Sequence, residues 1–169
     1  MPAPDPHDHD LPELTSDCAS CAGLCCVGLS FQKGAHFAID KAAGTPCPSL
    51  QRDHTCARHD SLDADGFSGC VAFDCAGAGQ RVTQMRFNGE TWQEAPELLF
   101  AMIKDFENLR PLHERMTQLK EAETLDLPPA LEQQRRALLR RHARLWADTP
   151  RLSQAFETFL VDLAQSTAP

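Results

Sequence analysis

The sequence predicts a mainly α-helical protein in which a small, irregular, metal-stapled cysteine-rich module precedes an α-helical bundle. The chain has 169 residues, and all eight cysteines fall between Cys18 and Cys75. The larger apolar residues lie mostly after Phe87, where they recur at helical spacing. This segregation indicates two regions that are held together by different means. We expect the module to span residues 15–87 and the bundle, of about four helices, to span residues 88–169.

Residues 1–14 are rich in proline, aspartate and histidine, which predicts a disordered tail. Within it, His7 and His9 are better explained as solvated side chains than as metal ligands. The tail has neither the basic start nor the apolar core of a secretory signal. No apolar run approaches the roughly 20 residues that are needed to cross a bilayer. We therefore expect a cytoplasmic protein without a membrane partner.

Residues 15–80 show little helical periodicity and contain many turn formers, including Gly23, Gly34 and Gly44. A region so poor in long apolar stretches needs a staple to fold, and a metal ion is one of the usual staples. Structural disulfides are rare in a reducing cytoplasm, where clustered thiols more often bind metal. The sequence therefore predicts that zinc or iron, either as an ion or in an iron–sulfur cluster, is bound here.

The candidate metal ligands are eight cysteines and one histidine. They are Cys18, Cys21, Cys25, Cys26, Cys47, Cys56, Cys70, Cys75 and His59. A C-x2-C pair such as Cys18 and Cys21 aims two sulfurs at one centre, and Cys56-x2-His59 is a second acceptable half-site. The adjacent residues Cys25 and Cys26 cannot easily point the same way. We expect one to join the first group while the other faces a second group or bridges two metals.

The spacing leaves the number of sites open. Eight thiols match two four-cysteine sites, and they equally match one site with spare cysteines that are packed, redox-active or disulfide-bonded. A disulfide-stapled or merely thiol-rich region is the alternative to metal binding. Eight thiolates around two zinc ions would add four negative charges, which nearby basic side chains could offset. The candidates for that role are Lys33, Lys41, Arg52 and Arg58.

Four amphipathic helices separated by prolines are predicted after residue 87. The first begins either at a capping box in residues 91–94 or at Pro96, and Pro111 breaks or kinks it. The apolar positions of the four helices fall in residues 99–109, 112–119, 131–146 and 152–163. Short proline-marked turns between such helices are typical of a compact bundle or a pair of helical hairpins. His113 and His142 fall within the apolar positions and are expected to pack at the edge of the core.

Several function classes find little support. The formal net charge is −8, so a nucleic-acid partner is not expected. The five arginines of the third predicted helix are best interpreted as a solvated face; they are Arg135, Arg136, Arg140, Arg141 and Arg144. Residues 77–80 are too short for a phosphate-binding loop and are expected to form a tight turn. A zinc ion held by four thiolates lacks the open position that catalysis requires, so we expect no enzymatic turnover.

The cysteine order and spacing resemble the CxxCxxCC-type family of zinc- or iron-chelating proteins, with three residues rather than two between Cys21 and Cys25. The stretch from Cys18 to about residue 125, including Trp92, is also similar to the N-terminal region of certain pentapeptide-repeat proteins. The five-residue repeats of those proteins are absent from this sequence, so their β-helix function is not transferred. The resemblance implies metal binding more strongly than it implies any biological process.

Three functions remain open from the sequence. The first is a metal-binding protein that acts as a scaffold, a metal carrier or an interaction module, with a protein partner as an open question. The second is an iron–sulfur redox protein or an accessory subunit of a modifying enzyme. The third is a thiol-based redox sensor, in which loss of the metal leads to disulfides.

Overall fold

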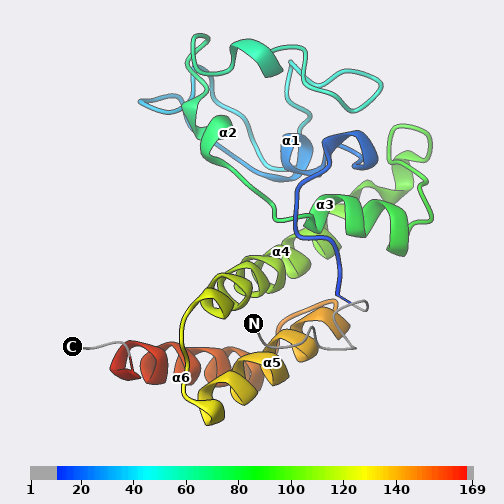
Figure 1. Ribbon diagram of the computed structural model, residues 1–169. Helices are drawn as coiled ribbons and strands as arrows, with labels where there is room; N and C mark the ends of the chain where they lie inside the picture. Colours follow the sequence, from blue (N-terminus) through cyan, green and yellow to red (C-terminus); the bar gives the residue numbers. More distant parts are fainter. Residues whose placement is uncertain (1–10, 167–169) are drawn as a thin grey trace.

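The computed structural model describes residues 11–166, and the chain is mainly helical as predicted (Figure 1). The cysteine-rich segment gathers at one end of the molecule, and α5 and α6 lie at the other end. Between them α4 runs as a long diagonal helix (Figure 1). The predicted tail falls partly outside this range, since residues 1–10 with His7 and His9 are not among those described. Within the described part, Leu11 and Leu14 pack against the hydrophobic core.

The cysteine-rich segment contains only short helices. They are the 3-10 helix Cys18–Ser20, α1 (Leu24–Gly28), the 3-10 helix His59–Ser61 and α2 (Ser68–Ala72). Two isolated antiparallel bridges, Phe31 with Lys41 and Leu50 with Cys56, are the extended pairings found among residues 11–166. The other residues of the module form the loops between these elements.

The helical part begins earlier than residue 88. It consists of α3 (Ala78–Arg81), the π-helix Val82–Arg86, the 3-10 helix Pro96–Leu98, α4 (Leu99–Glu121), the 3-10 helix Ala122–Thr124, α5 (Pro129–Arg144) and α6 (Pro150–Ser166). The expectation of a tight turn at residues 77–80 is wrong, because α3 begins there. Residues 91–94 form a turn closed by a hydrogen bond from Thr91 to Glu94, so the first long helix is entered at Pro96.

The prediction of two helices separated at Pro111 is wrong, because α4 runs through this proline as one helix of 23 residues. A proline inside a helix removes one backbone hydrogen bond and costs about 3 kcal/mol. The residues on both sides of it are buried without a break, including Phe106, Leu109, Leu112 and Met116. Burying each such side chain stabilises the fold by about 1.5–3 kcal/mol. Their combined burial outweighs the cost of the proline.

One hydrophobic core joins the cysteine-rich segment to the helices. Ala22, Leu24 and Val27 belong to the same buried cluster as Met102 and Phe106 of α4. Contacts outside this cluster extend the junction. A Cβ built on Gly28 would touch the Ile103 side chain at 3.5 Å, and the Trp92 indole N–H donates to the Ala22 carbonyl over 2.7 Å. The start of the module is therefore anchored on α4 by ordinary apolar packing.

Charged and polar groups are also buried between the helices. Arg135, expected on a solvated face, is only 2% exposed because its guanidinium donates to both carboxylate oxygens of Glu132 and to the Leu119 carbonyl. His113 and His142, expected at the edge of the core, are both fully buried. Within the described residues, no helix is both long and apolar enough to span a membrane.

Candidate metal centre

All eight cysteines are free thiols, and seven of them are partly buried while Cys18 is exposed. They form two neighbourhoods on the short elements of the module. One neighbourhood lies where the first C-x2-C pair meets the start of α3. The other lies in the loops that follow α1. The Cys25–Cys26 pair, on α1, stands between the two.

The first neighbourhood forms around Gly79 of α3. A Cβ built on Gly79 would lie 2.6 Å from the Cys21 sulfur and 3.8 Å from the Cys75 sulfur, so these two sulfurs are neighbours. Cys21 and Cys75 are far apart in the sequence, and only a residue without a side chain lets both thiols approach the helix. The thiols of Cys18 and Cys25 are close enough to interact electrostatically with this pair.

Hydrogen bonds of residues 15–17, called the strap below, hold Cys75 in place. The Ser16 hydroxyl donates to the Asp74 carboxylate over 2.6 Å and lies 3.2 Å from the Cys75 sulfur, from which it can accept the thiol hydrogen. The Gln80 side chain accepts from the Asp17 N–H and donates to the Thr15 carbonyl, which fastens the strap to α3. The side chains around the Cys75 sulfur are therefore already held in place by hydrogen bonds.

The second neighbourhood is built by loop hydrogen bonds. The Cys47 N–H donates to the Cys26 carbonyl over 2.9 Å, and Leu50, three residues later, is bridged to Cys56. Cys70, on α2, interacts electrostatically with Cys47, Cys25 and Cys56. Loops that are separated in sequence therefore bring Cys47, Cys56 and Cys70 near one another.

Cys25 and Cys26 connect the two neighbourhoods. Their sulfurs lie 3.9 Å apart, and Cys25 interacts electrostatically with cysteines on both sides. The sequence prediction that these adjacent residues serve different groups or bridge two metals is compatible with this position, but stays a prediction.

Four of the thiols have raised pKa values. Burial raises the pKa of Cys21 to about 12, and it also raises the pKa values of Cys18 and Cys70. For Cys25, the hydrogen bond with Cys26 is the largest cause of the raised pKa, followed by burial. Nearby thiolates add repulsion in each case, and a bound cation would reverse this balance.

Lys41 is the basic side chain that the structure brings to the second neighbourhood. It is buried, and its ammonium donates to the carbonyls of Val27, Ala42 and Thr45 over 2.9–3.2 Å. Burial lowers the pKa of Lys41, while the nearby thiolates of Cys47, Cys26 and Cys25 raise it in opposition. Of the other three predicted basic residues, Arg58 is paired with Asp65.

The donor chemistry fits a soft metal. Thiolates are ligands that suit zinc and iron, and none of these sulfurs is lost to a disulfide. Among residues 11–166, no three cysteine, histidine or acidic side chains are already drawn together as a coordination shell. The sulfurs are therefore neighbours that would have to close around an ion.

His59 lies at the surface of the molecule. Its side chain is 74% exposed and contacts Asp60 at 3.4 Å. Sequence reasoning overlooked a different histidine, His54, which has a left-handed backbone (φ 66°) and a buried Nδ1 without a hydrogen-bond partner. No spacing pattern in the sequence singles out His54, because its surroundings include residues after Gly89, which are distant from it in the sequence.

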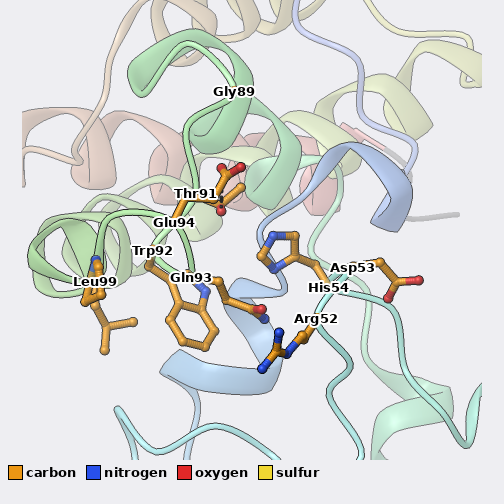
Figure 2. A pocket seen from close by; sticks show the side chains of 10 residues that line it. Arg52, Asp53, His54, Gly89, Thr91, Trp92, Gln93, Glu94 and Leu99 are labelled. Atoms are coloured by element: carbon orange, nitrogen blue, oxygen red, sulfur yellow. Dashed lines mark hydrogen bonds between the residues drawn. The ribbon is translucent and has the colours of Figure 1, made fainter.

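A cavity of about 900 Å³ lies beside His54, where the module meets the segment leading to α4. Figure 2 shows Arg52, His54, Trp92 and Gln93 turned toward the same space, whereas Asp53 points away from it. The rings of His54 and Trp92 are 6.4 Å apart. None of the ten described residues that line the cavity is a cysteine, so it is separate from the sulfur groups.

Comparison with known proteins identifies a relative without a described function. The uncharacterized protein YybG of Bacillus subtilis (strain 168) is 40% identical over 139 residues, which is 82% of this chain. The chain spans about half the length of that curated relative. No family model matches the chain, and no solved structure matches it.

Proposed function

We propose that this chain is a metal-binding cysteine-cluster protein, in which zinc or iron staples the cysteine-rich module and no catalytic turnover occurs. The observation that carries the proposal is the absence of a core in the middle of the module. Among the described residues between Val27 and Phe67, no apolar side chain is buried, and the buried side chain there is the charged Lys41.

Backbone hydrogen bonds alone do not explain order in such a stretch. Fixing the backbone costs roughly 1–2 kcal/mol per residue, and a hydrogen bond returns a net of only about 0.5–1.5 kcal/mol. The cysteines that frame the stretch, Cys26 before it and Cys70 after it, offer the missing stabilisation if they share a metal. Metal binding free energy then becomes folding free energy.

The ligand chemistry favours a structural role over catalysis. Four thiolates close a tetrahedral site, which leaves no position for water or substrate. The resemblance of the cysteine spacing to the CxxCxxCC-type chelating family supports the same assignment. We assign His59 no part in it, because its exposed side chain faces Asp60.

Elemental analysis with a visible spectrum tests the proposal on protein purified without oxygen and without added metal. Near-stoichiometric zinc in a colourless sample is the result expected for a structural or carrier protein. Iron with inorganic sulfide and a brown colour also supports metal stapling and moves the protein to redox chemistry. Protein without metal, with its thiols paired as disulfides, would refute the proposal.

A further inference from the structure

We propose that the eight cysteines form two separate four-thiolate metal centres. The first consists of Cys18, Cys21, Cys25 and Cys75, and the second consists of Cys26, Cys47, Cys56 and Cys70. This division rests on the proposed function, since it assigns the ligands of the metal that staples the module. It goes beyond the sequence, whose spacing is equally compatible with one centre and spare thiols.

Two sulfurs of the first centre, those of Cys21 and Cys75, are brought together by the start of α3. Cys21 and Cys75 both face Gly79, and the Ser16 hydroxyl, which is bonded to Asp74, also contacts the Cys75 sulfur. The exposed Cys18 lies within electrostatic range of Cys75 and Cys25. A single ion at this place would therefore be enclosed by the first C-x2-C pair and by the chain entering α3.

The second centre is assembled from loops that lack a core. Cys47 is tied to Cys26 by a 2.9 Å backbone hydrogen bond, and Cys56 is placed by the Leu50 bridge. Cys70 joins them from α2, where its N–H donates to the Phe67 carbonyl. A metal here would connect loops along the stretch between Val27 and Phe67, in which no apolar side chain is buried.

The division falls between Cys25 and Cys26 because successive residues of a helix point about 100° apart. Cys25 lies within electrostatic range of Cys18 and Cys21. The Cys26 carbonyl accepts a 2.9 Å hydrogen bond from the Cys47 N–H, which ties Cys26 to the second neighbourhood. With sulfurs 3.9 Å apart, the two residues form a common wall between the centres.

Paired substitutions test the division. In Cys18→Ser/Cys75→Ser both changes fall in the first centre, and in Cys47→Ser/Cys70→Ser both fall in the second. In Cys18→Ser/Cys70→Ser each centre loses one thiolate. We expect the unaltered chain to hold two metal ions per chain by native mass spectrometry. After a chelator challenge, each same-centre pair should retain one ion, and the cross-centre pair should retain none.

A matched readout separates ligand loss from unfolding. Far-ultraviolet circular dichroism follows the helices α4, α5 and α6, which contain no cysteine. Cobalt(II) in place of the native metal gives thiolate-to-metal absorption for each centre, which should fall by half in both same-centre pairs. If a double variant loses its helices, its metal content is set aside. The number of metal ions bound by the unaltered chain then tests the division, and two ions are expected.

Two results would overturn the division. The first is one ion per chain in the unaltered protein, which leaves the proposed function standing. The second is a same-centre pair that loses all metal while its helices persist, because that result requires a single shared cluster. An unaltered chain without any metal would refute the proposed function as well.

Discussion

Gly79 is the residue on which the first group of sulfurs depends. Replacing glycine by alanine inside a helix normally stabilises it by about 1 kcal/mol. In Gly79→Ala the new Cβ would lie 2.6 Å from the Cys21 sulfur, closer than such contacts are found. We expect this variant to be less stable than the unaltered protein and to hold less metal, as measured by thermal unfolding and elemental analysis.

Gly34→Ala is the matched control for this substitution, because a Cβ at Gly34 meets only a carbonyl oxygen at 4.0 Å. Unchanged stability and metal content in both variants would show that the sulfurs do not need the space above Gly79.

Lys41 is expected to strengthen metal binding in the second neighbourhood. Its buried ammonium lies near Cys25, Cys26 and Cys47, so it offsets part of the charge of a thiolate site. Lys41→Met should weaken metal binding there by roughly tenfold, which corresponds to about 1.4 kcal/mol. Chelator competition measures this affinity, and Lys41→Arg should preserve most of it.

The exposed Lys33 provides the control, since Lys33→Met removes the same charge from the surface of the module. Equal affinities for Lys41→Met and Lys33→Met would remove any special role for the buried ammonium.

Glu132 makes stability depend on acid pH. The side chain of Arg135, followed by that of Arg136, lowers the pKa of Glu132 from its usual 4.5 to about 2. A carboxylate with a lowered pKa stabilises the fold above its unfolded pKa, and this contribution is lost as the pH falls from about 4.5 toward 2. Allowing for solvent screening, we expect roughly 1–2 kcal/mol.

Comparison of unaltered protein and Glu132→Gln by urea unfolding isolates this contribution. The stability difference should be present at pH 7 and should shrink through that pH window. Glu157→Gln, on an exposed position of α6, is the control. A difference between the unaltered protein and Glu132→Gln that does not change with pH would contradict the ion-pair explanation.

At the residue scale, chemistry was easier to predict than position. The cysteines identify a thiol-rich site by type and spacing alone. The exposure of His59 and the buried Nδ1 of His54 could not be predicted from the sequence, because the environment of each histidine depends on which loop it meets. Arg135 was misjudged for a related reason, since the Leu119 carbonyl that it binds lies on α4 and only tertiary packing brings the two helices together.

At the scale of elements, α4 connects the two ends of the molecule. Its buried side chains contact α1 and α3 at one end and α5 at the other. Hydrophobic periodicity predicted most of the buried apolar positions, because burial follows the 3.6-residue repeat, although Leu160 is 38% exposed. It failed at Pro111, where local propensity favours a break and tertiary packing favours one continuous helix.

Pro111→Ala tests this balance. Alanine restores a backbone hydrogen bond and removes the helix penalty of proline, so the free energy of unfolding should rise by about 1–3 kcal/mol. Denaturant unfolding measures this change. Pro129→Ala is the control, because Pro129 occupies the first turn of α5, where proline is tolerated. A less stable Pro111→Ala variant would show that the helix needs the proline.

At the scale of the whole molecule, a single core joins regions that differ in how they are stabilised. The sequence indicated two regions with a boundary near residue 87, and it could not reveal that Ala22, Leu24 and Val27 pack with α4. The start of the module is therefore held by apolar burial. The loops between Val27 and Phe67 lack such burial, and we attribute their order to metal.

The central claim, that metal staples these loops, is tested most directly by hydrogen exchange of the purified protein with and without a strong chelator. We expect chelation to remove protection from residues 29–66, while α5 and α6 keep theirs. Protection in α1 should weaken without vanishing, because its apolar side chains remain packed on α4. Unchanged protection in residues 29–66 after complete metal removal would contradict the account.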